Sequence, residues 1–91
     1  MLSSIQRDAF RLSTLSAVAE SAPLGIDLEG LHTTHASKGG PALTQEEHAR
    51  EVEAIVSQGW LSKRPGLLNK NKHRYHLTDA GQTVLVQHGL A

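Results

Sequence analysis

Apolar residues recur at helical spacing in the first part of the chain. They stand three or four positions apart, the period that puts side chains on one helix face: Ile5, Ala9, Leu12, Leu15 and Ala19. Ser3 followed by Gln6 reads as a capping box at the start of this pattern. Pro23 and Gly25 then stop it. The pattern predicts a helix over residues 4–20.

Two shorter helices are predicted next, after a short extended pair at residues 25–26. Asp27 can cap the first of them, which runs through about residue 35, with a hydrophobic staple between Ile26 and Leu31. The turn of residues 37–41 ends it.

The clearest helix of the chain starts at Thr44. Glu47 stands three residues on and completes a second capping box. Val52, Ile55 and Val56 then form an apolar stripe. We expect this third helix to end near Gly59.

The last third of the chain predicts a hairpin and a final helix. Residues 60–64 and 74–77 have the pattern of strands, with a turn at Pro65-Gly66. Thr78 is a suitable N-cap for a helix over residues 79–88, and Gly89 would end it.

Composition narrows the class of protein. The 91 residues allow one domain, residues 1–91. The chain has no cysteine, which excludes disulfides and thiolate metal sites, and its single Phe, Trp and Tyr argue against an all-β sandwich. The start has no basic leader before an apolar run, and no stretch has the length of a membrane span, so we expect a cytoplasmic protein. The predicted order of helices and strands indicates an α+β fold that is mainly helical.

The order of elements resembles the winged form of the helix-turn-helix. Residues 52–61 are similar to the end of the third helix in winged-helix regulators, and residues 75–81 resemble the second wing strand of MarR-like and PadR-like proteins. The size also resembles small phage-encoded winged-helix proteins. The resemblance implies a three-helix core, a wing of two or three strands and a C-terminal helix. It also implies DNA binding in transcription regulation.

A DNA-binding role assigns two groups of contact residues. Between residues 60 and 76 there are five cations and no acid, and these would hold the phosphate backbone: Lys63, Arg64, Lys70, Lys72 and Arg74. The third helix and the turn before it would face the major groove, where Gln reads adenine, Arg guanine and Glu cytosine: Lys38, Gln45, Glu46 and Arg50, with Glu53 as a further candidate.

An alternative class stays open, because the third helix is acidic. Glu46, Glu47, Glu51 and Glu53 lie on the helix that should approach phosphates, and nine Lys and Arg are balanced by nine Asp and Glu. DNA-binding domains are usually basic. The alternative is a protein-docking adaptor that offers this helix to a basic protein partner and does not bind DNA.

Other chemistry has less support. His32 and His35 are one helical turn apart and could chelate a metal, but no third ligand follows in a known pattern, and we expect neither metal nor cofactor. No catalytic motif is present, so we expect no enzyme. We place His48 at the edge of the third helix, His88 near a helix end and Trp60 in the core. Val86 and Leu90 are candidates for a homodimer contact through the C-terminal helix.

Overall fold

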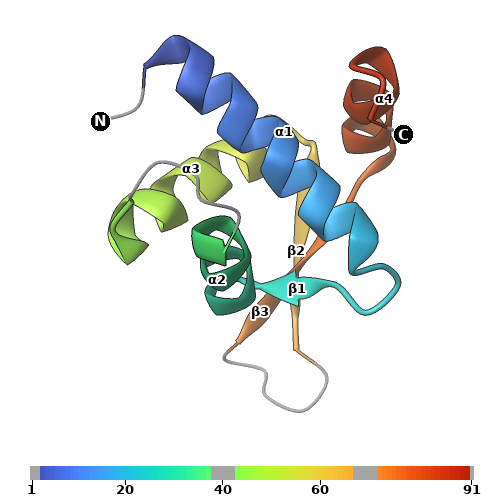
Figure 1. Ribbon diagram of the computed structural model, residues 1–91. Coiled ribbons are helices and arrows are strands. Elements are labelled where there is room, and N and C mark those ends of the chain that lie inside the picture. Colours follow the sequence, from blue (N-terminus) through green and yellow to red (C-terminus); the bar gives the residue numbers. More distant parts are fainter. Residues whose placement is uncertain (1–2, 38–42, 67–71, 91) are drawn as a thin grey trace.

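The computed structural model describes residues 3–37, 43–66 and 72–90, which form four helices and three strands (Figure 1). Along the chain they are α1 (Ser4–Glu20), β1 (Ile26–Asp27), α2 (Leu28–Ser37), α3 (Gln45–Ser57), β2 (Leu61–Pro65), β3 (His73–Leu77) and α4 (Asp79–Gln87). This order confirms the predicted α+β, mainly helical winged-helix fold. Within the described ranges, no helix is both long and apolar enough to cross a membrane.

The helix starts are fixed by the capping side chains that the sequence indicates. Ser3 accepts a hydrogen bond from the Gln6 amide at 3.2 Å, and Thr44 accepts one from the Glu47 amide at 3.1 Å. In both capping boxes the side chain of the third helical residue, Gln6 or Glu47, accepts a hydrogen bond from the backbone amide of the capping residue. Asp27 caps α2, because its Oδ1 accepts a bond from the Gly30 amide at 2.8 Å. These bonds satisfy donors that a helix start leaves without partners.

The three strands form one antiparallel sheet in the order β1-β3-β2. The hairpin extends further than the sequence predicts, because Pro65 belongs to β2 and pairs with His73 instead of forming the turn. Pro65 is tolerated there because β2 is an edge strand, where one backbone donor is not needed. The Gly66 amide then donates to the Lys72 carbonyl at 2.9 Å.

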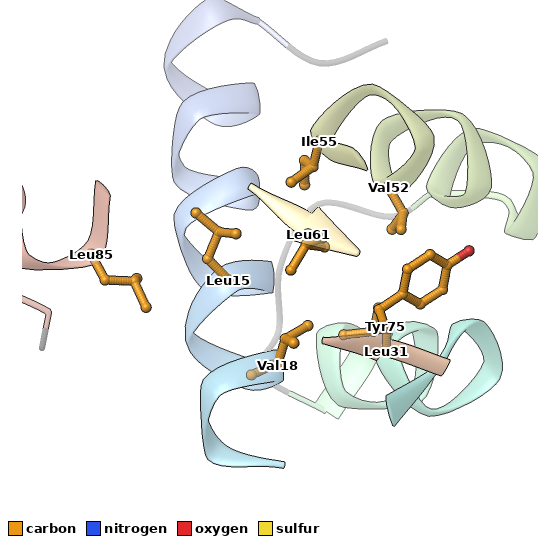
Figure 2. Packing of buried hydrophobic residues seen from close by; sticks show 9 residues of the cluster. Leu15, Val18, Leu31, Val52, Ile55, Leu61, Tyr75 and Leu85 are labelled. Atoms are coloured by element: carbon orange, nitrogen blue, oxygen red, sulfur yellow. The ribbon is translucent and has the colours of Figure 1, made fainter. Parts of the chain in front are cut away.

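The core lies between α1 and the other elements. Its largest side chains come from every helix and from both hairpin strands (Figure 2): Leu15, Val18, Leu31, Val52, Ile55, Leu61, Tyr75 and Leu85. Figure 2 shows Leu85 of α4 on the far side of α1 from the residues of α3 and the sheet. Trp60 is half-buried and packs against this core, as predicted.

Candidate nucleic-acid interface

The polar flank of α3 and the hairpin border one hollow of about 370 Å³. Gln45 and Glu53 line it from α3, while Lys63 and Lys72 line it from the hairpin. Glu29, in the first turn of α2, also lines it. The elements expected to contact DNA therefore lie next to each other in space.

Most of the predicted contact residues that the structure describes are exposed. Gln45, Glu46 and Arg50 are exposed on the N-terminal half of α3. On the hairpin the exposed cations are Lys63, Arg64 and Lys72. Lys38 and Lys70 lie outside the described residues.

Arg74 differs from the other cations of the predicted set. Its side chain is half-buried, and Nη1 donates a hydrogen bond to the Gly25 carbonyl at 3.3 Å. Arg74 also lies opposite Asp27 in the antiparallel pairing of β3 with β1. Its guanidinium therefore links the hairpin to the segment before α2. Replacing Arg74 would therefore change the sheet as well as the charge.

Carboxylates of α2 and α3 neutralise three of the exposed cations. Lys63 Nζ donates to Glu53 Oε1 at 2.9 Å, and this bond raises the pKa of Lys63. Lys72 Nζ lies 3.7 Å from Glu29 Oε2. Two further predicted contact residues, Arg50 and Glu46, lie 4.0 Å apart one turn along α3. These carboxylates thus offset part of the positive charge that the sequence of the hairpin indicates.

The exposure of these pairs limits their strength. The side chains of Lys72 and Glu29 are 62% and 72% exposed, and those of Arg50 and Glu46 are 73% and 86% exposed. Lys63 and Glu53 are 37% and 50% exposed. Exposed ion pairs contribute about 0–1 kcal/mol each. A ligand that offers a better counter-charge can therefore separate them at small cost.

A cluster of histidines was not predicted from the sequence. His48 is completely buried rather than at the helix edge, and its Nδ1 lies 2.8 Å from Nδ1 of His32. Burial, followed by the nearby His32 and His35, lowers the pKa of His48 to about 4. The signal was available, because His48 stands four and seven residues before Val52 and Ile55 and so continues the apolar stripe of α3. Within the described part of the chain, no group of three or more possible ligands is arranged for a metal ion.

Two large apolar side chains at the C-terminal end of α4 are exposed. Val86 is 55% exposed and Leu90, just past the helix, is 50% exposed. His88 occupies the C-cap of α4, near the helix end where the sequence places it.

The fold is similar to the crystal structure of the transcriptional regulator BldR from Sulfolobus solfataricus. The TM-score is 0.72 over 87% of this chain, with 16% sequence identity. The present chain spans about half of that regulator, since the match covers 50% of its length. No protein-family model and no curated protein sequence matches the chain. The structural likeness confirms the expected winged-helix fold.

Proposed function

We propose that this chain is a DNA-binding transcriptional regulator that acts by occupying a duplex site. The observation that carries the proposal is the common hollow, which places the polar flank of α3 beside the cations of the hairpin. Helix-turn-helix proteins put the second helix of the motif into the major groove, and here that helix is α3. The proposal places the protein in the cytoplasm and assigns it no catalytic reaction.

The two groups of residues have separate roles in the proposal. Gln45, Glu46 and Arg50 face base edges, where Arg50 suits guanine and Gln45 suits adenine. Lys63, Arg64 and Lys72 hold phosphates and set the orientation of the domain on the duplex. Lys38 and Lys70 belong to the same proposed contacts.

The ion pairs on the surface are compatible with this role. Glu53 and Glu29 hold Lys63 and Lys72 in exposed positions, so a phosphate needs to displace only contacts of about 0–1 kcal/mol each. The two carboxylates then remain near the duplex and weaken non-specific binding. Such a protein depends more on base contacts than a strongly basic one does.

The salt dependence of binding tests the hairpin assignment. We would measure fluorescence polarisation of a labelled random-sequence duplex at several salt concentrations, with the wild type and a Lys63→Ala/Arg64→Ala/Lys72→Ala variant. Each phosphate contact contributes about −0.9 to the slope of log affinity against log salt, so the variant should have a slope shallower by about 3. Arg74 stays in place in the variant, because it supports the sheet.

Arg7→Gln is the control, since Arg7 bonds Glu51 on the α1 side of α3. It should leave the salt slope unchanged. An equal slope for wild type and triple variant would contradict the hairpin assignment.

The proposal includes a homodimer through the C-terminal helix. Exposed Val86 and Leu90 supply an apolar contact, and a two-fold dimer would match a palindromic pair of half-sites.

A second candidate function is a protein-docking adaptor. Glu29, Glu46 and Glu53 each hold a cation of the predicted DNA contact set, and the chain has no net charge. In this candidate the same carboxylates receive basic side chains of a protein partner. The two candidates predict opposite effects of removing these carboxylates.

A further inference from the structure

A buried histidine in the N-terminal half of α3 contacts side chains of α1 and α2. His48 has no exposed surface. Its ring centroid lies 5.0 Å from that of Phe10 on α1 and 5.0 Å from that of His32 on α2. The ring of His35, also on α2, lies 5.6 Å away. The position of α3 against α1 and α2 thus depends on this ring at its centre.

The hydrogen bond between His32 and His48 requires an unprotonated nitrogen on one of the two rings. Each Nδ1 can either donate or accept, and the 2.8 Å separation allows one proton between them. While His48 is neutral, one Nδ1 can donate and the other accept. When both rings carry two N–H groups, the two Nδ1–H groups oppose each other. Full protonation of the pair therefore breaks the bond.

The other nitrogen of His48 offers the charge no compensation. Nε2 is buried and has no hydrogen-bond partner among the described residues. Burying an ionised group without a partner is strongly unfavourable. His48 is also the fourth residue of α3, near the positive end of the helix dipole, which disfavours a cation.

The charged groups on the elements packed against His48 do not stabilise a protonated ring. On α1, the neighbour is the apolar ring of Phe10, while Arg7 and Arg11 both approach Glu51. The neighbours from α2 are His32 and His35, which add positive charge when protonated. On α3 itself, Glu47 accepts the bond from the Thr44 amide. The groups that set the pKa of His48 in the described structure include no carboxylate.

We propose that this histidine cluster is a proton-sensitive clamp that holds the N-terminal half of α3 against α1 and α2 only while His48 is neutral. Acidification then releases the half of α3 that carries Gln45 and Arg50. The clamp is a property of the fold and operates without DNA, so it goes beyond the proposed function and does not depend on it.

The sign of the effect follows from the direction of the shift. The pKa of His48 is lowered from 6.5 to about 4 in the folded chain, so the unfolded chain binds one more proton between these values. Stability is therefore complete above pH 6.5 and falls as the pH decreases towards 4. Because unfolding takes up one proton in this range, each decrease of one pH unit lowers the folding equilibrium constant roughly tenfold.

NMR of the wild type tests the clamp directly. The imidazole signals of the six histidines and the backbone amides of α3 would be followed from pH 8 to pH 3.5. We expect the His48 ring to stay neutral well below pH 6.5, its ordinary pKa. It should become protonated together with the loss of the native amide signals of residues 45–50. A His48 ring that titrates near pH 6.5 while these signals stay native would overturn the proposal.

A variant separates the proton effect from the loss of packing. His48→Leu fills the site without a titratable group, and urea unfolding followed by Trp60 fluorescence would be measured at several pH values. Whatever the stability of this variant at pH 7, its folding equilibrium constant should no longer decrease tenfold per pH unit between about pH 6 and 4. His73→Asn, at an exposed hairpin position, should keep it. An unchanged pH slope in His48→Leu would contradict the clamp, and the wild-type titration decides the matter if this variant does not fold.

Discussion

Two glutamates of α3 differ in how strongly their ion pairs stabilise the fold. Glu51 accepts a hydrogen bond from Arg7 at 3.2 Å and lies 3.6 Å from Arg11, and its side chain is only 15% exposed. Glu46, on the opposite side of the helix, faces Arg50 with 86% of its side chain exposed. Screening by water weakens the second pair far more than the first. Glu51 thus stabilises the α1–α3 contact, whereas Glu46 is available for other partners.

This contrast predicts different effects of two equal substitutions. Glu51→Gln should lower the free energy of unfolding by about 1–3 kcal/mol, because it leaves the partly buried Arg11 without its counter-charge. Glu46→Gln should change it by less than about 0.5 kcal/mol. Urea unfolding of both variants at neutral pH, monitored by Trp60 fluorescence, measures the difference. Equal effects would show that burial does not set the strength of these pairs.

At the scale of elements, the start of α4 is fixed by contacts with the turn between α3 and β2. Thr78 Oγ1 donates to the Gly59 carbonyl at 2.6 Å, and the Thr78 amide donates to the Trp60 carbonyl at 3.2 Å. Gly81 lies directly over this turn. A Cβ added at Gly81 would clash with the Trp60 carbonyl oxygen and come within 2.8 Å of a Leu77 methyl group. The close approach of α4 therefore requires glycine.

We predict that Gly81→Ala destabilises the protein despite the higher helix propensity of alanine. The backbone of α4 must move away from Trp60, and overpacking of this kind costs about 1–3 kcal/mol. Thermal unfolding followed by circular dichroism would detect the lower Tm. Gln82→Ala, at the next and exposed position, serves as the control and should have little effect. An unchanged or higher Tm for Gly81→Ala would show that α4 is not held this closely.

The elements could be predicted from the sequence because their signals are local. The capping residues Ser3, Thr44 and Thr78 fixed the helix starts, and all three bonds are present in the structure. Pro65 was assigned to the turn because proline usually interrupts strands. Its place in β2 depends on the order of strands in the sheet, which local patterns do not contain.

The candidate site was less predictable than the fold. The cations of the hairpin stand together in the sequence, but Glu53 and Glu29, which pair with Lys63 and Lys72, stand far from them along the chain. Such pairs depend on how α2 and α3 pack beside the hairpin. The burial of His48 likewise depends on Phe10 and His32, which come from other helices.

At the scale of the whole molecule, the proposed dimer gives a prediction for α4. Val86→Asp/Leu90→Asp should shift the protein towards monomer, because it places charge on the exposed apolar residues. Sedimentation equilibrium over a range of protein concentrations measures the association. Gln87→Asp adds a carboxylate at an exposed position between them and should weaken association less. A wild type that remains monomeric at the highest concentration would contradict the dimer.

The charge balance of the molecule also separates the two candidate functions. Glu29 and Glu53 lie beside the hairpin cations, so their removal makes the surface between α3 and the hairpin more positive without altering a proposed phosphate contact. Glu20, exposed at the far end of α1 from its cap, provides a matched control for loss of one carboxylate.

The most direct measurement is the affinity of a Glu29→Gln/Glu53→Gln variant for duplex DNA, by fluorescence polarisation at fixed low salt, beside wild type and Glu20→Gln. DNA binding by α3 and the hairpin predicts that the double variant binds more tightly than the wild type, since Lys63 and Lys72 no longer have to leave a carboxylate. It also predicts that Glu20→Gln matches the wild type. No binding by any of the three proteins, or equal binding by all, would contradict the proposed DNA interface.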